Sequence, residues 1–541
     1  MLKSGYLEII IITFSLIFSF WLMFHTFSDS QGTMQIATKA WSDFSSHIPL
    51  IKSFSFGENF PPQYPLFAGP PIHYHFLFYL LVGTLEKVGL RIDWSLNIPS
   101  ALGFASLLII IYYFTKKIFN SQAAALLSVI FFLFNGTLSF LYFLRDHPLS
   151  LNFFQEIINN QKFPSFGPYD EGLVAAFWNL NIYTNQRHLA LAYALSLIII
   201  LVLLRPILKQ SKPNLGVSIL LGITLGLSFF FHLAVLLMTI VVLISLTILF
   251  PRLFKQTFIV LGLAAILILP QYLYLQSGGS GFKLSLVPGY LAASNLNLIN
   301  LLSYWFANLG FHLFLIPLGI WVAPPLSRKI LISFLPVFII GNLFQFSPEM
   351  AGNHKFFNYF MILGVMFSAY FLVYLWKTHY LLKPLVIIWI LVLTFSGIID
   401  FFPVLNDGKM QIADYPKDPD VAWIIHNTSP QAVFLNTSYI FDKASLAGRK
   451  IFMGWPYFAW SAGYDTDTRG QVQKQLLGSQ DITTACQLLV RNNLDYLELS
   501  PGAASDPNIP PISPLFVQQF QPIYRNPISG YIIYSIEENC P

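Results

Sequence analysis

Long apolar segments recur through the first 400 residues, and they restrict the fold more than any other feature. A helix of roughly 18 to 25 apolar residues can cross a bilayer, where every backbone polar group must be satisfied within the protein. The pattern predicts a polytopic all-α membrane protein with about 11 transmembrane helices. They are expected at 5–27, 93–115, 121–143, 187–204, 215–231, 233–250, 256–275, 298–323, 330–346, 356–376 and 384–402.

Charge supports this class and orients the chain. Only 10% of the residues are charged, against about 25% in soluble domains. The run at 5–27 is too long for a removable signal peptide and lacks a small-residue cleavage site, so we read it as a retained signal anchor. The basic residues lie in short loops between apolar runs, which is a signal of membrane orientation and not of nucleic-acid binding.

The segment 72–90 decides the topology. If it lies along the membrane interface as an amphipathic helix, the basic loops, such as Lys116 with Lys117, all fall on one side. That side is the cytoplasm by the positive-inside rule. We therefore expect a multi-pass protein of the cell (plasma) membrane, with a cytoplasmic N-terminus. Residues 28–92 form a long outer loop, and the loops 144–186, 276–297 and 347–355 are also outside.

The composition changes after Pro403, where charged and turn residues return. We divide the chain into a transmembrane domain, 1–402, and a small extracytoplasmic α/β domain, 403–541. Strands are expected at 432–435, 494–499 and 531–536, and helices at 421–426 and 483–492. The two cysteines, Cys486 and Cys540, form either one disulfide or two free thiols, and the sequence leaves both alternatives open.

Asp43 is the leading catalytic candidate, because it is an acidic residue close behind the first apolar run of a chain poor in charge. We expect it in a Pro- and aromatic-rich loop. A carboxylate there can act as a general base that accepts the proton of an acceptor hydroxyl. The structural alternative is that Ser42 or Asp43 caps a helix that begins at Phe44.

Other candidates lie in the remaining outer loops. Asp146 follows the third run and could bind the acceptor or a divalent cation, with an ion pair to Arg145 as the alternative. His354, Lys355 and Arg187 each lie at the outer start of an apolar run, where they suit the phosphate of a lipid donor or serve as snorkelling helix ends. Further candidates for the same site are His47, His73, His75 and Glu349.

No zinc-ligand spacing and no Gly-rich phosphate loop occurs in the sequence. Lone histidines such as His232 and His312 are expected to make interhelical hydrogen bonds. We therefore assign no metal site and expect no required cofactor, with a divalent cation as the open alternative.

The order of these parts resembles the GT-C superfamily of membrane glycosyltransferases, which includes protein O-mannosyltransferases, aminoarabinose transferases and many uncharacterised bacterial and archaeal members. The resemblance rests on the first run, the early acid Asp43, the segment after Pro70-Pro71, the second acid Asp146 and a closing soluble domain. Gly454-Trp455-Pro456 also resembles the C-terminal region of large members. It implies a GT-C fold, with Asp43 as catalytic base. The first loop has one acid and not an Asp-x-Asp pair, which leaves metal dependence open.

The resulting hypothesis is a glycosyltransferase that moves a sugar from a polyprenyl-phosphate donor to an unknown glycan, lipid or protein acceptor at the outer membrane face. A non-catalytic membrane protein of envelope polysaccharide assembly is the first alternative. A transporter or flippase is disfavoured, because transporters carry ionisable residues near the bilayer midplane, whereas those of this chain collect at one face.

Overall fold

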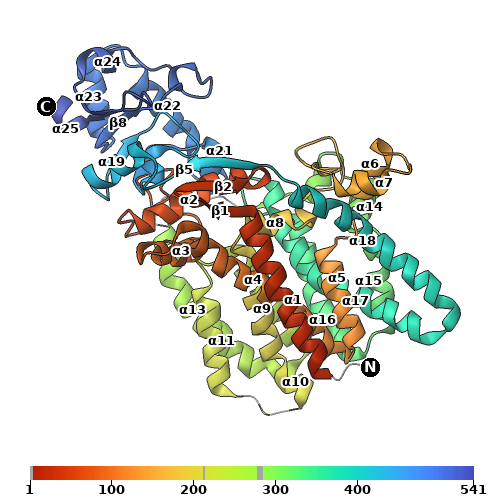
Figure 1. Cartoon of the computed structure of the whole chain (residues 1–541). Helices are drawn as coiled ribbons and strands as arrows, with labels where there is room; N and C mark the ends of the chain where they lie inside the picture. Colours follow the sequence, from red (N-terminus) through yellow and green to blue (C-terminus); the bar gives the residue numbers. More distant parts are fainter. Residues whose placement is uncertain (1–3, 211, 213, 277–283, 541) are drawn as a thin grey trace.

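A computed structural model describes residues 4–210, 212, 214–276 and 284–540 (Figure 1). A bundle of helices makes up most of the molecule, and the C-terminal domain lies at one end of it. The long helix α4 (Ile92–Phe119) is central, because it packs against α1 (Ser4–Thr26), α5 (Gln122–Leu133) and α9 (Leu189–Leu203). Most of the side chains along α4 are buried.

Six segments of the described chain are long and apolar enough to cross a membrane, which supports a multi-pass membrane protein. They are Gly5–Thr26, Ile92–Phe119, Pro251–Gln276, Pro325–Leu343, Met350–Thr378 and Tyr380–Leu405. A seventh is counted if α14 (Leu298–Leu309) and α15 (His312–Val322), which are bent by 83° relative to each other, form one broken span.

The predicted count of about 11 spans is not confirmed. Four of the expected runs form the shorter apolar helices α5, α9, α11 (Leu215–Leu227) and α12 (Leu233–Leu249), of 12 to 17 residues. At 1.5 Å per residue these helices are about 18–26 Å long, less than the hydrocarbon thickness of about 30 Å. The remaining helices of this part are α6 (Ser139–Asp146), α7 (Phe153–Ile158), α8 (Asn181–Asn185), α10 (Arg205–Lys209), α13 (Phe254–Gln276), α16 (Pro325–Leu343), α17 (His354–Thr378) and α18 (Lys383–Leu405).

The stretch after α1 is folded rather than loop-like. Strands β1 (Phe27–Asp29) and β2 (Thr33–Ala37) pair antiparallel, and β2 pairs again with β5 (Lys409–Ala413) from the far end of the chain. Helix α2 (Trp41–Ser55) follows and contains Asp43, so the expected loop is wrong at this point. Helix α3 (Leu77–Lys87), of 11 residues, occupies the segment that we expected not to span. Strands β3 (Ser285–Leu286) and β4 (Phe344–Gln345) form a separate short pair.

The C-terminal domain is built on a five-stranded sheet of order β7-β6-β8-β10-β9. Its strands β6 (Val433–Leu435), β8 (Tyr496–Leu499) and β10 (Ile532–Ser535) lie where strands were predicted. Strand β6 is parallel to β7 (Lys450–Ile451) and β8, while β10 is antiparallel to β8 and β9 (Pro522–Arg525). The helices are α19 (Pro419–Asn427), α20 (Lys443–Leu446), α21 (Pro456–Ser461), α22 (Thr466–Leu477), α23 (Ile482–Arg491), α24 (Leu515–Gln519) and α25 (Ile536–Asn539).

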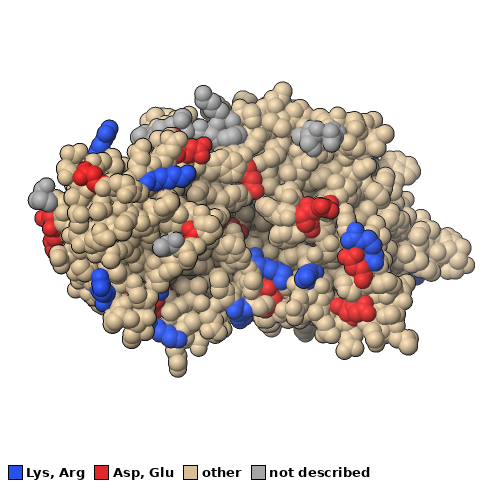
Figure 2. Space-filling model, turned by 90° about the horizontal axis from the view of Figure 1, so that it is seen from above, with Lys and Arg blue, Asp and Glu red and all other residues tan. Residues whose placement is uncertain are grey.

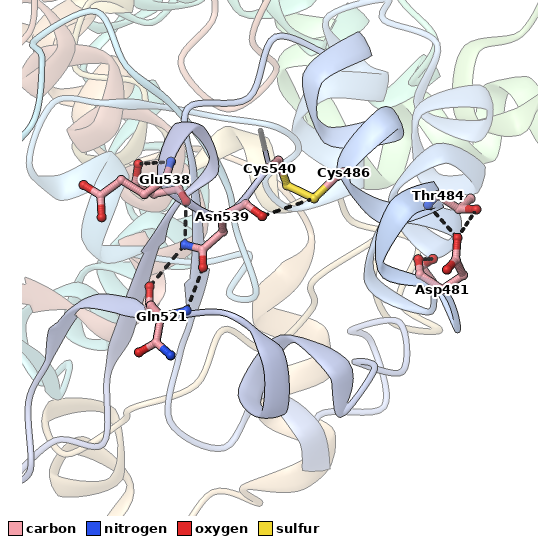
Figure 3. The surroundings of a disulfide bond; sticks show 9 residues. Asp481, Thr484, Cys486, Gln521, Glu538, Asn539 and Cys540 are labelled. Atoms are coloured by element: carbon pink, nitrogen blue, oxygen red, sulfur yellow. Dashed lines mark hydrogen bonds between the residues drawn. A yellow bond between two sulfur atoms is a disulfide. The ribbon is translucent and has the colours of Figure 1, made fainter.

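A disulfide joins Cys486 on α23 to Cys540 just after α25 (Figure 3). This decides between the two alternatives that the sequence left open. The bond closes a segment of 54 residues. Asn539, next to Cys540, also bonds Gln521, so the end of the chain is tied to the strand that begins beside it.

Two buried cations join α2 to the C-terminal domain. Lys52 Nζ lies 2.7 Å from Glu86 Oε1 on α3 and 2.6 Å from Asp414 Oδ2, which follows β5. The Arg449 guanidinium donates to the carbonyl oxygen of Phe56, directly after α2, at 2.9 Å. Because both cations are almost fully buried, their hydrogen bonds fix α2 against the domain.

Candidate functional site

A cavity of about 980 Å³ lies where the first outer segment, the start of α17 and the C-terminal domain meet. Asp43 on α2, His73 and His75 before α3, and Glu349 and Lys355 near the start of α17 line its wall. The face on which the C-terminal domain lies is hollowed near its centre and carries side chains of both charges (Figure 2). Parts of the chain far apart in sequence therefore build one pocket with both charges in its wall.

Helix α2 presents Asp43 without capping by it. The N-cap residue is Ala40, no side chain caps this end, and the helix begins at Trp41. Among the described residues, no group donates a hydrogen bond to the Asp43 carboxylate. The capping alternative is therefore wrong, and the carboxylate is left for the cavity.

The surroundings of Asp43 make it a stronger base than an ordinary carboxylate. Burial within the cavity wall raises the pKa of Asp43 from 3.8 to about 6. The positive charge of Lys355 opposes this rise, and the negative charge of Glu349 adds to it. Desolvation disfavours the charged form of a carboxylate, so burial is the main cause. The group is still mostly ionised at neutral pH and can accept a proton.

The turn before α17 positions the cationic side of the cavity. Asn353 donates to the carbonyl of Gly341 at 2.9 Å, which fixes the turn against the end of α16. The His354 ring stacks on Phe177 with ring centroids 4.3 Å apart, and Lys355 Nζ lies 3.4 Å from His354 Nε2. Lys355 thus enters the cavity beside a fixed imidazole.

Glu349 lies on the same wall and is held by a tyrosine. The Tyr169 hydroxyl donates to Glu349 Oε1 at 3.1 Å. Tyr457, on α21 of the C-terminal domain, also lines the cavity. The domain therefore contributes to the wall and is not separate from the site.

The histidines of the first outer segment differ in their surroundings. His47 is buried next to the cavity, with its Nε2 3.4 Å from the Tyr74 hydroxyl, and burial lowers its pKa to about 3. The His73 ring lines the cavity and stacks on Tyr464 with ring centroids 4.4 Å apart. Burial also lowers the pKa of His73 and that of His75, so these rings are neutral at pH 7.

Two predicted site residues lie apart from the cavity wall. Asp146 is exposed and forms an ion pair with Arg145 at 2.8 Å, which is the structural alternative that the sequence offered. Arg187 is buried, and its guanidinium donates to Thr184 O, Asn97 Oδ1 and Thr26 Oγ1. With these donors already used inside the protein, Arg187 is placed as a packing residue between helices, and neither residue enters our proposal.

No family model matches the chain, and no curated protein matches it. Two solved structures are similar over nearly its whole length. One is the apo oligosaccharyltransferase of Archaeoglobus fulgidus, with a TM-score of 0.51 and 11% identity over 98% of this chain and 74% of that one. The other is AglB of the same organism in complex with an inhibitory peptide and a dolichol-phosphate, with a TM-score of 0.50 and 12% identity over 100% and 75%.

The chain has the GT-C fold. This confirms the resemblance inferred from the order of its segments. The identity is too low to transfer residues from these neighbours, so the site rests on the geometry of this chain alone.

Sequence reasoning underrated two residues beside the GT-C cavity. His188 and His232 each directly precede an apolar helix, α9 and α12. His75 Nε2 lies 2.7 Å from His188 Nε2, and the His75 ring stacks on His232 with centroids 4.8 Å apart. Their shared position, immediately before an apolar run, is the only sequence signal that could have grouped them.

Proposed function

We propose that this GT-C protein is a glycosyltransferase that moves a sugar from a polyprenyl-phosphate donor to an acceptor hydroxyl, with Asp43 as the general base. The observation that carries the proposal is one cavity that holds a carboxylate without a protein hydrogen bond and a lysine whose charge acts on it. A base and a phosphate-binding cation are the two groups that such a transfer needs.

The reaction is a single displacement. The acceptor oxygen attacks the anomeric carbon and gives its proton to Asp43, while the bond between that carbon and the donor phosphate oxygen breaks. The electron pair stays on the phosphate, and the configuration at the anomeric carbon is inverted. General-base catalysis of this kind contributes about 10²–10⁴-fold to the rate.

Lys355 and His354 are assigned to the donor phosphate. An ammonium is a compact charge suited to phosphate, and the His354 ring beside it is fixed by stacking. Glu349, which accepts from Tyr169, is assigned to the acceptor side. His73 and His75 line the remaining wall and are candidates for contacts to the sugar.

Apolar side chains give the lipid part of the donor a route into the cavity. Leu233 and Leu237 on α12, together with Leu275 at the end of α13, line the cavity. Helix α13 belongs to a segment that is long and apolar enough to cross the membrane. A polyprenyl chain between these helices would place its phosphate at the level of the cavity wall.

The site is assigned to the outer face of the membrane. A disulfide forms and persists in oxidising compartments and is rare in the cytoplasm, and the Cys486–Cys540 bond lies in the domain that lines the cavity. The one-sided basic loops support the same orientation. Cysteine-accessibility labelling of positions introduced after residue 410 tests it, and labelling from the cytoplasmic side would overturn the outer-face assignment.

A divalent cation remains the alternative for the carboxylate side. Asp43 and Glu349 supply hard oxygen donors of the kind that Mg²⁺ or Mn²⁺ prefers, and both line the cavity. Such an ion would polarise the donor phosphate. Transfer that survives chelation with Asp43→Asn still inactive supports the metal-free scheme.

The deciding experiment measures sugar transfer from a lipid-linked donor by the purified protein. Wild type and Asp43→Asn are compared, with release of polyprenyl phosphate as the readout. Turnover by wild type that is lost in the variant supports the proposal. No turnover by wild type with any lipid-phosphate sugar favours the non-catalytic role in envelope polysaccharide assembly.

A further inference from the structure

Three histidines from three different segments converge at one side of the cavity. His75 precedes α3, His188 precedes α9 and His232 precedes α12. One ring nitrogen of each lies within 4.8 Å of the others. His75 and His232 line the cavity, and His188 and His232 are almost fully buried. Among the described residues, this is the one group of three or more His, Cys, Asp or Glu side chains that close together.

The hydrogen bonds inside the cluster leave one nitrogen without a partner. His75 Nε2 and His188 Nε2 are 2.7 Å apart and can share a single proton. His232 Nε2 is buried and, among the described residues, has no hydrogen-bond partner. A buried polar atom that is left unpaired calls for a bound water or ion.

We propose that His75, His188 and His232 form a binding site for a divalent transition metal, with Zn²⁺ as the best match. Three imidazoles and one open position are a typical donor set of a non-structural zinc site. The borderline-soft imidazole selects Zn²⁺ over Mg²⁺ or Ca²⁺. The open position would face the cavity through His75 and His232.

The distances suit a metal after small ring movements. Zn–N bonds of about 2.0–2.1 Å in a tetrahedron place ligand nitrogens about 3.3 Å apart. That value lies between the 2.7 Å of the His75–His188 pair and the 4.8 Å limit of the group. The His75 and His232 rings are 12° from parallel, so they must tilt toward a shared ion.

The far sides of two rings are already held. The Tyr79 hydroxyl lies 2.8 Å from His188 Nδ1, and this contact turns Nε2 toward the cluster. Val235 N donates to His232 Nδ1 at 3.4 Å, a long contact that gives way when Nδ1 carries the proton. Such outer partners typically change metal affinity by about 10–100-fold.

The charges around the cluster allow a dication. The charge of Lys355 acts on all three rings, and the negative charges of Asp43 and Glu349 act on Lys355 in turn. A metal at this side would add a second positive centre to the wall that we assign to phosphate. The inference goes beyond the proposed transfer and does not depend on it.

The test measures metal binding without any sugar donor. Full-length, tag-free protein in detergent is stripped with a chelator, loaded with Zn²⁺ alone, desalted and analysed by mass spectrometry for metal content. Wild type is expected to retain about one equivalent, and Co²⁺ in its place to give the absorption of a tetrahedral site. His188→Gln and His232→Gln should each bind at least tenfold more weakly, and Tyr79→Phe about 10–100-fold more weakly.

His312→Gln is the matched control. His312 is equally buried, but its Nδ1 bonds Ser368 Oγ at 2.9 Å and it lies outside the cluster. It should keep the full equivalent. Wild type that retains no zinc overturns the site and leaves the cluster a hydrogen-bonded group only. Equal binding by wild type and His188→Gln, or equal loss in the control, overturns it as well.

Discussion

Replacing Asp43 by Asn should abolish transfer and stabilise the protein at the same time. The variant keeps the size of the side chain and loses the base, so we expect a rate lower by about 10²–10⁴-fold with donor binding largely kept. A structural residue would show the opposite on stability. The two measurements together therefore separate a catalytic Asp43 from a structural one.

The stability effect follows from the pKa. Asp43 titrates at about 6 in the fold against an ordinary 3.8, which corresponds to about 3 kcal/mol as an upper limit. Because the folded pKa is raised, the free energy of unfolding is highest below about pH 3.8 and falls as pH rises through 6. Asn does not titrate. The variant should thus gain up to about 3 kcal/mol above pH 6 and match wild type near pH 4.

The assays are thermal unfolding in detergent at pH 4 and 7.5, and turnover across the same range. Wild-type kcat/KM should rise with pH up to about 6 and then level off, because only the ionised carboxylate is a base. Asp146→Asn, an exposed acid away from the cavity wall, is the companion variant and should keep activity. Near wild-type turnover by Asp43→Asn, or lower stability at pH 7.5 together with lost turnover, would refute the reasoning.

Three further predictions test the wall of the cavity and its support. Lys355→Ala should raise the apparent donor KM with a smaller effect on kcat, and unchanged donor dependence would make Lys355 a helix-end anchor. Lys52→Ala leaves two buried carboxylates unpaired and should lower the free energy of unfolding by about 3–5 kcal/mol; an unchanged melting temperature would contradict this. Cys486→Ser opens a 54-residue segment and should cost about 4 kcal/mol in the chain-entropy model, seen as faster proteolysis of the C-terminal domain, with Cys540→Ser as its equal.

The sequence predicted the elements whose signal is local. Apolar runs mark the long helices, and the strands β6, β8 and β10 follow short runs rich in aliphatic and aromatic residues. The position of Lys355 and Glu349 at one end of α17 also follows from the run that begins there. Such features depend on a few neighbouring residues, which is why a single sequence reveals them.

Helix α2 was missed because its stability is not local. The segment Trp41–Ser55 contains Pro49 and five serines, residues that disfavour a helix interior. Every residue from Phe44 to Ser55 is buried, so packing against the rest of the protein stabilises the helix in place of intrinsic propensity. The pairing of β2 with β5 and the convergence of His75 with His188 and His232 likewise join segments far apart in the chain.

The cavity wall suits a reaction in which negative charge changes place. Before transfer, Asp43 is ionised and the donor phosphate, esterified at both ends, carries one negative charge. Afterwards Asp43 is protonated, and the released polyprenyl phosphate, esterified at one end, can carry two. The charge of Lys355 acts on Asp43 in the free protein, and in the proposed reaction it meets the growing charge on the phosphate as that on the carboxylate disappears. The total charge in the cavity then stays constant, so no charge needs to be brought from water into a desolvated wall, where it is most costly.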